Sequence, residues 1–176
     1  IAYVTQEDLF FSNLSVQDTL RFTASVRLPD SVSRETKEQC VMEVMARLRL
    51  EKTAHTRVGD GLFDKGISGG ERKRMSIANE LLTDPAVMIL DEPTSGLDSS
   101  TALTVVQIMK ELAKEGKTVI TTIHQPSSQM FAEFDQLLLL SEGSTVYFGD
   151  AKGAYDYFAQ LGFRCPFGYN YADYYL

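Results

Sequence analysis

The chain has 176 residues, 44% of them hydrophobic, which is enough apolar material for one domain with a buried core. The 17 Lys and Arg residues against 24 Asp and Glu residues give a net charge of -7, which argues against nucleic acid as a partner because a phosphate backbone repels an acidic surface. Cys40 and Cys165 form neither a metal-ligand spacing nor a disulfide framework, and no apolar run reaches the roughly 18 residues of a membrane-spanning helix.

The first half of the chain has one strand pattern followed by helical patterns. Residues 1–5, IAYVT, have the composition of a strand. A capping pattern at Ser15 begins a helix, the segment 34–50 places its apolar residues on one helical face, and Ser68 begins a further helix. We therefore expect a helical lobe over about residues 15–82.

Strand and helix patterns alternate from residue 86 onward. The expected elements are, in order, a strand at 87–91, a helix at 99–114, a strand at 118–124, a short helix at 127–134, strands at 136–141 and 144–149, and a helix at 151–161. Strands that alternate with helices are typical of a largely parallel sheet covered by helices on both faces. The second half of the chain therefore predicts an α/β fold.

Polar side chains follow three of the predicted strands at the point where each strand ends. Asp91 and Glu92 follow the apolar run 87–90, Gln6 follows the first strand, and His124 ends the third. Ligands of a parallel sheet bind outside the carboxyl ends of its strands, so we expect these side chains to face a ligand. Because adjacent carboxylates repel each other, a cation or a polarised water stabilises them. One acid can therefore bind Mg²⁺ while the other orients a water for phosphoryl transfer.

Each of these residues also has a simpler interpretation. The sequence DEPTSG at 91–96 can be a turn that merely ends a strand. An isolated Gln after a strand is commonly a loop residue, and a lone histidine is commonly structural, as we expect for His55. The glycines in ISGGERKR at 67–74 allow a phosphate to approach a helix N-terminus, but Ser68-x-x-Glu71 is also a capping box.

Together these motifs resemble the ATP-binding cassette (ABC) ATPases over essentially the whole chain. The matching motifs are the Q-loop, the signature, the Walker B strand, the D-loop and the switch histidine, found here as Gln6, ISGGE at 67–71, VMILDE at 87–92, SGLD at 95–98 and His124. Finer details such as TQEDLFF, KGISGGERKRMSI, TIHQPSSQMF and GYNYADYYL resemble the G subfamily, the White-type half transporters and their pleiotropic-drug-resistance relatives. In that subfamily the nucleotide-binding domain precedes the membrane domain.

The resemblance implies a P-loop NTPase-like (RecA-like) α/β fold, with a mostly parallel sheet flanked by helices and an inserted helical subdomain. Its helical signature subdomain would span about residues 15–82, and its catalytic core would comprise residues 1–6 and 86–163. Residues 164–176 would begin the connection toward a membrane domain. On this basis residues 1–176 are expected to be a partial nucleotide-binding domain whose N-terminal part is missing.

The sequence departs from the family pattern at three places. It has no Walker A motif, because the only G-x-x-x-x-G, from Gly61 to Gly66, is followed by Ile67 in place of the phosphate-binding Lys. We interpret that spacing as a coincidence and expect the 176 residues alone to be inactive. Glu71 stands where many cassettes have Gln, which is usual in the G subfamily, and Tyr171 stands where related sequences often have Pro.

The mechanism that the resemblance implies is Mg²⁺-dependent ATP hydrolysis at the interface of two such domains. Glu92 and His124 would be catalytic, Asp91 would bind the metal, and Gln6 would contact the metal or the attacking water. The nucleotide-binding residues of the same chain would be Ser68, Gly69, Gly70, Glu71 and Asp98. Of these, the first three would reach the nucleotide held by the partner, and Asp98 would link the two sites. The basic residues 72–74 are predicted to form a solvated helix face. The alternative is that their positive charge adds a favourable electrostatic potential near a bound phosphate.

The resemblance favours the energy-coupling domain of a membrane transporter over two other functions. The full-length protein would lie in a membrane with this domain on the cytosolic side, joined to its own transmembrane domain downstream and paired with a second nucleotide-binding domain, as a homodimer or a heterodimer. The alternatives are a soluble ABC ATPase of translation or DNA repair and a catalytically silent regulatory cassette. A downstream region of six hydrophobic helices would separate the first two, and an upstream Walker A without its Lys would favour the third.

Overall fold

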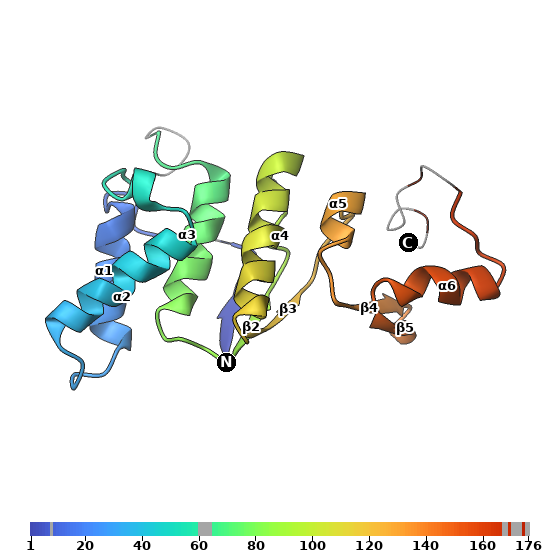
Figure 1. Cartoon of the computed structure of the whole chain (residues 1–176). Helices are drawn as coiled ribbons and strands as arrows, with labels where there is room; N and C mark the ends of the chain where they lie inside the picture. Colours follow the sequence, from blue (N-terminus) through green and yellow to red (C-terminus); the bar gives the residue numbers. More distant parts are fainter. Residues whose placement is uncertain (8, 60–64, 167–168, 170–173, 175–176) are drawn as a thin grey trace. The chain divides into compact units, whose positions relative to one another are not determined.

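The computed structural model describes residues 1–7, 9–59, 65–166, 169 and 174, and the chain divides into two compact units, residues 1–123 and 124–176. Figure 1 shows the course of the chain. The elements of the first unit are β1 (Ala2–Val4), α1 (Val16–Arg27), α2 (Arg34–Arg47), the 3-10 turn η1 (Glu51–Thr53), α3 (Gly69–Leu81), β2 (Val87–Leu90), α4 (Ser99–Lys114) and β3 (Thr118–Thr121). Those of the second unit are α5 (Ser128–Phe131), β4 (Gln136–Ser141), β5 (Ser144–Asp150) and α6 (Gly153–Gln160).

The first unit contains a parallel sheet in the order β1-β2-β3. The connection from β1 to β2 runs through α1, α2 and α3, and the connection from β2 to β3 runs through α4. Helical crossovers of this kind are what keep neighbouring strands parallel. In the register, Val4 lies beside Leu90, and Leu90 lies beside Thr121, so the three strands end at the same edge. The parallel α/β fold predicted from the sequence is confirmed.

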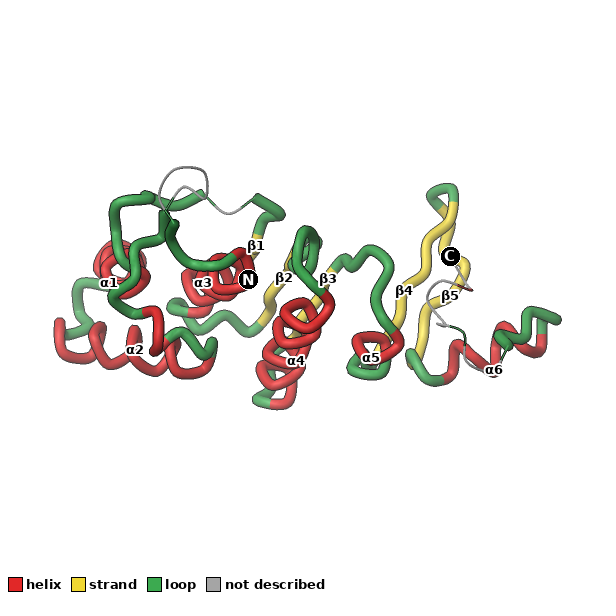
Figure 2. Tube along the Cα trace, turned by 90° about the horizontal axis from the view of Figure 1, so that it is seen from above, coloured by secondary structure: helices red, strands yellow, loops and turns green. Residues whose placement is uncertain are grey.

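Helices α3 and α4 pack on one face of this sheet. The strand residues buried on that face are Ala2, Val4, Met88 and Leu90. Helix α4 lies along one side of β2 and β3 in both views of the backbone (Figures 1 and 2). On the opposite face Tyr3 and Ile120 are both more than half exposed. In the part of this unit that the structure describes, helices thus cover one face of the sheet, and helical cover of the other face stays a prediction.

Three helices, α1 to α3, occupy the segment 15–82 that was predicted as a helical lobe, and each begins at a serine. The side-chain oxygens of Ser15, Ser33 and Ser68 accept hydrogen bonds from backbone N–H groups of the first helical turn, as N-cap residues do. The largest fully buried side chains of this lobe are Leu20, Met45, Leu48, Leu50, Met75 and Ile77. The ion pair between Arg27 and Glu80 joins α1 to α3, with an N–O distance of 2.6 Å.

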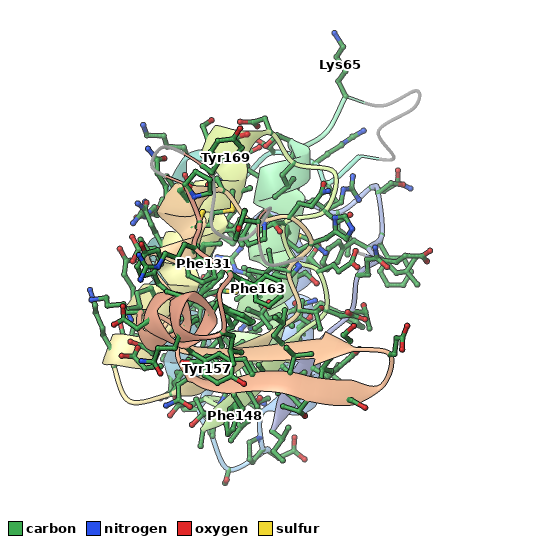
Figure 3. All side chains as sticks on the ribbon, turned by 90° about the vertical axis from the view of Figure 1, so that its right-hand side faces the viewer. Lys65, Phe131, Phe148, Tyr157, Phe163 and Tyr169 are labelled. Carbon is green, nitrogen blue, oxygen red and sulfur yellow. The ribbon has the colours of Figure 1, made fainter. Side chains whose placement is uncertain are left out.

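The second unit is a β-hairpin covered on one side by a helix. Strands β4 and β5 are antiparallel, and only Glu142 and Gly143 connect them, both with positive φ (47° and 75°), which is the geometry of a two-residue hairpin turn. The predicted parallel arrangement thus does not extend to these strands. Tyr157 of α6 packs on Tyr147 with ring centroids 5.1 Å apart, whereas Phe148 points away from α6 and is exposed (Figure 3).

Candidate functional site

The carboxylate of Asp91 lies directly after β2, at the shared carboxyl edge of the three strands. Its backbone N–H donates to the carbonyl of Val4 at 2.9 Å, so backbone hydrogen bonding to β1 continues one residue beyond the end of β2. One side-chain oxygen, Oδ1, accepts from the hydroxyl of Thr122 at 2.8 Å, and the other, Oδ2, accepts from the hydroxyl of Tyr3 at 3.2 Å. These two donors fix the orientation of the carboxylate, and the hydrogen bond to Asp91 raises the pKa of Tyr3.

Glu92 turns away from the strand direction at the next residue. Its φ is 42°, in the left-handed region that residues other than glycine rarely adopt. Its side-chain Oε2 accepts from the Nε2 amide of Gln6 at 2.8 Å. The two adjacent acids therefore have different partners, and the backbone turn begins at Glu92 itself. A backbone outlier at a proposed catalytic residue is consistent with strain held by the surrounding structure.

Thr122 connects the two acids. Its hydroxyl donates to Asp91 and accepts from the backbone N–H of Glu92 at 2.9 Å, so a single oxygen touches both residues. The backbone N–H of Thr122 donates to the carbonyl of Leu90 at 3.1 Å, which continues the pairing of β3 with β2. Neither this threonine nor Tyr3 was predicted from the sequence as a site residue. The available signal was the hydroxyl at the end of the strand TVITT, next to the strand that ends in the acids.

The beginning of α3 holds the four residues predicted to bind nucleotide from the signature motif. The hydroxyl of Ser68 accepts from the N–H of Glu71 at 3.3 Å, and Glu71 Oε2 accepts from the N–H of Ser68 at 2.8 Å. This is the reciprocal capping box that the sequence left as an alternative. Gly70 has a packing role, because a Cβ at this position would lie 2.1 Å from the side chain of Thr101 on α4. At Gly69 the nearest atom would be 3.5 Å away, which is ordinary contact.

Asp98 is the N-cap residue of α4. Its Oδ1 accepts from the backbone N–H groups of Ser100 and Thr101, both at 3.1 Å, and from the Ser100 hydroxyl at 2.6 Å. These bonds stabilise the charged carboxylate, so the pKa of Asp98 falls far below its ordinary value, with the bond from the Ser100 side chain as the largest cause. The predicted D-loop residue is thus also the residue that begins the helix.

The capping role of Asp98 predicts a stability that depends on pH. A carboxylate whose pKa is depressed by folding stabilises the folded state above its unfolded pKa of about 3.9, and this contribution is lost as the pH falls further. Asp98→Asn keeps a capping oxygen but does not titrate. We expect the wild type to melt at a higher temperature than the variant at neutral pH, and the difference to shrink below about pH 4. Melting curves of both proteins over this range test it, and a constant difference would count against the assignment.

His124 is the first residue of the second unit and is exposed. The strand predicted at 118–124 ends at Thr121, so the prediction that this strand reaches the histidine was wrong. Pro126 lies two residues after His124, shortly before α5 begins. The role of His124 in catalysis stays a prediction.

The three consecutive basic residues on α3 do not form the solvated face predicted for them. Arg72 donates to the carbonyls of Val58 and Gly59, and Lys73 donates to the carbonyls of Thr5 and Gln6. Arg74 donates to the carbonyls of Leu48 and Arg49, and its burial lowers its pKa. Successive residues of a helix point in directions about 100° apart, which is how one run of charge reaches three separate backbone segments.

Two sequence predictions lie partly or wholly outside the described residues. Residues 61–64 of the coincidental glycine pattern from Gly61 to Gly66 lie outside the described residues, and so does Tyr171, in the segment 170–173. Gly66 itself is described, and a Cβ there would overlap the carbonyl oxygen of Val58 at 1.9 Å. Close backbone packing therefore accounts for this glycine without a phosphate.

The parallel sheet, with an Asp-Glu pair and a glutamine amide at its carboxyl edge, is an α/β arrangement of the kind found in P-loop NTPase-like domains. Residues 1–95 match the family described as ABC transporter, and residues 124–176 match the family described as ABC-2 type transporter. The chain belongs to the ABC transporter family, and within it to the nucleotide-binding part of the G subfamily.

Individual relatives support the subfamily. ABC transporter G family member 22 of Arabidopsis thaliana is 48% identical over 176 residues, which is 100% of this chain and 23% of the relative. ABC transporter G family member 26 of the same plant is 50% identical over 176 residues, 100% of this chain and 26% of the relative. Protein white of Drosophila melanogaster is 49% identical over 175 residues, 99% of this chain and 26% of the relative. The chain thus spans about a quarter of the length of these curated relatives.

Proposed function

We propose that this chain belongs to a transporter that binds and hydrolyses ATP to move a substrate across a membrane. The observation that carries the proposal is the arrangement of Asp91 and Glu92 at the carboxyl edge of the parallel sheet. Their carboxylates are held by different donors, which gives each acid a separate task. Family membership supports ATP as the nucleotide.

Glu92 is the residue we assign to the attacking water. A general base must lie within hydrogen-bond reach of the proton that it accepts. Glu92 follows β2 at the carboxyl edge of the sheet, and its carboxylate accepts from the Gln6 amide at 2.8 Å. In this assignment Glu92 accepts a proton from the water as the oxygen attacks the γ-phosphorus, and the bond to the bridging oxygen of ADP breaks. Gln6 keeps the carboxylate oriented, and His124 steadies the γ-phosphate.

Asp91 and the side-chain carbonyl of Gln6 are the residues we assign to Mg²⁺. The described residues contain no group of three or more His, Cys, Asp or Glu side chains that could hold a metal by themselves. The pair formed by Asp91 and Gln6 fits Mg²⁺, which is commonly bound by one or two carboxylates together with substrate phosphates and waters. When bound, Mg²⁺ neutralises charge that develops on the phosphate oxygens. Thr122 and Tyr3 orient the Asp91 carboxylate for this contact.

A second nucleotide-binding domain is the partner we assign to the beginning of α3. Ser68, Gly69 and Gly70 would reach the nucleotide of that partner, Glu71 would hold the turn through the capping box, and Asp98 would link the two sites. A helix N-terminus with exposed N–H groups attracts phosphate, which supports the assignment. Each chain would then contribute to two sites, in a homodimer or a heterodimer.

A transmembrane domain of the same protein is the second partner. The match of residues 124–176 to the ABC-2 type transporter family supports it. In the segment after Gln6, Leu9 is 87% and Phe11 is 69% exposed, and such apolar side chains suit contact with another protein surface. The nucleotide-binding domain to which this chain belongs would lie on the cytosolic side of the membrane. Among the residues that the structure describes, no helix has the length and apolar composition to cross a bilayer.

Asp91→Asn in the full-length protein tests the metal assignment. We expect the Mg²⁺ concentration that supports half-maximal ATP binding to rise at least about 10-fold, the low end for losing even an outer-shell partner of a metal. Nucleotide binding measured across a Mg²⁺ titration gives this value. Asp84→Asn is the matched control, because it removes the same charge from an exposed residue that pairs with Lys117. Equal Mg²⁺ dependence in both variants would contradict the assignment.

A further inference from the structure

Lys73 lies in the middle of α3 and is only 4% exposed. Its ammonium donates to the carbonyl of Gln6 at 2.8 Å and to that of Thr5 at 3.4 Å. Burying an ammonium group is costly unless strong acceptors compensate it, so these carbonyls are part of what keeps the cation in place. The contact joins α3 to the turn that follows β1, 67 residues away in sequence.

The residue that Lys73 contacts is also the residue that contacts Glu92. Lys73 binds the backbone of Gln6, while the side chain of Gln6 donates to Glu92 at 2.8 Å. A long side chain such as Gln keeps one geometry only when its backbone is fixed, because its rotamer freedom is large. The position of the Gln6 amide against Glu92 therefore depends on the hydrogen bond from Lys73 to the Gln6 backbone.

The same helix begins at the residues assigned to the partner nucleotide. Ser68 caps α3, and Lys73 lies about one and a half turns further along the same helix. An α-helix of this length behaves as a rigid element, so a displacement at its first turn moves Lys73 as well. The contacts thus form one continuous path from the beginning of α3, through Lys73 and Gln6, to Glu92.

We propose that Lys73 is a positioning residue that ties the signature helix to Gln6, so that engagement of a nucleotide at the beginning of α3 sets the contact of Gln6 with Glu92. This inference rests on the proposed function, since it assigns a route between the two sites to which one chain contributes. The contact of Lys73 with Gln6 affects the rate of the chemical step, whereas ATP affinity depends on the contacts with the phosphates. Lys73 acts through Gln6 and does not itself touch the nucleotide.

The test is a double-mutant cycle on ATP turnover of the full-length protein, with Lys73→Met made in the wild type and in Gln6→Ala. We expect Lys73→Met to lower kcat about 10-fold in the wild type, the equivalent of one charge-assisted hydrogen bond, with KM for ATP changed less than about 2-fold. In the Gln6→Ala protein the same change should lower kcat less than about 2-fold, because the group that Lys73 positions is already gone. Equal fold losses in the two backgrounds would overturn the proposal.

Arg72→Met is the matched control. It removes a cation from the neighbouring position of α3, where the guanidinium bonds the carbonyls of Val58 and Gly59 and not those of the Gln6 turn. We expect kcat within about 2-fold of the wild type for this variant, the size of a minor packing effect. A loss as large as that of Lys73→Met would mean that any damage to α3 lowers turnover, and would overturn the proposal.

If Lys73→Met does not accumulate as folded protein, Lys73→Gln replaces it, because a neutral amide keeps a donor in the same buried position. The expected loss is then about threefold in the wild type and again less than about 2-fold in Gln6→Ala. Absence of ATP turnover in the wild-type protein would count against the proposed function itself, whereas turnover without coupling between Lys73 and Gln6 would count against this inference alone.

Discussion

Glu92→Gln in the full-length protein is expected to bind ATP as tightly as the wild type and to lose about 10²- to 10⁴-fold in turnover, the usual range for a general base. Glutamine has the size of glutamate and keeps an oxygen that can accept from Gln6, as Glu92 does at 2.8 Å. The substitution removes only the charge and the basic oxygen. Its fold should therefore be intact, including the left-handed backbone at this position, which the neighbouring contact with Thr122 supports.

The measurement is steady-state release of phosphate together with ATP affinity on the same preparation. Glu111→Gln is the matched control, because Glu111 is an exposed residue of α4 that pairs with Arg49 at 2.8 Å. An exposed pair contributes little, so the control should hydrolyse ATP at close to the wild-type rate. Parental turnover in Glu92→Gln would mean that the Asp-Glu pair is only a turn that ends a strand.

Ser68→Ala is expected to abolish most ATPase activity of the full-length protein while it lowers the free energy of unfolding by only about 1 kcal/mol, the typical cost of a lost N-cap. The reason is that two roles coincide at one hydroxyl. The structure gives the capping role directly, through the bond from the N–H of Glu71 at 3.3 Å. The contact with the partner's nucleotide is the proposed second role, and only the loss of turnover reports on it.

Ser33→Ala separates these two roles. Ser33 caps α2 with the same geometry, since its hydroxyl accepts from the N–H of Thr36 at 3.2 Å. Both variants should lose a similar amount of stability in chemical denaturation, and only Ser68→Ala should lose ATP turnover. Equal ATPase activity in the two variants would mean that Ser68 is only a capping residue. It would also remove the support for a nucleotide site shared by two nucleotide-binding domains.

Much of the first unit could be predicted from the sequence because its signals are local. The apolar run 87–90, the capping serines and the helical periodicity each depend on a few neighbouring residues, and each gave the observed element. The Asp-Glu pair could be placed at the ligand edge for the same reason, since β2 ends immediately before it. Gln6 was expected at this edge, and its amide does contact Glu92.

The contacts that the sequence did not predict depend on residues far apart in the chain. A run of three basic residues is usually exposed, but here each cation bonds carbonyls that are 13 to 68 residues away in sequence. Thr122 and Tyr3 approach Asp91 only because β1 and β3 flank β2 in the sheet. No periodicity or capping rule contains that strand order, so these roles required the structure.

In the second unit a local signal was present, but the prediction gave more weight to the alternation of strands and helices upstream. Residues 136–141 and 144–149 were predicted as strands of a largely parallel sheet because strands and helices alternate upstream of them. The two residues Glu142 and Gly143 between them fit a tight turn, and a connection this short permits only an antiparallel pair. The turn length was the better evidence for this region.

The identity of the nucleotide that stays bound to Glu92→Gln tests the central claim most directly. Full-length wild-type protein and the variant are incubated with labelled ATP and Mg²⁺, separated from free nucleotide, and the bound label is identified by chromatography. If Glu92 serves the attacking water, the variant retains intact ATP, because the step that converts it is blocked, while the wild type yields ADP and phosphate. Recovery of ADP from the variant at the wild-type rate would contradict the claim that this carboxylate edge is where ATP is hydrolysed.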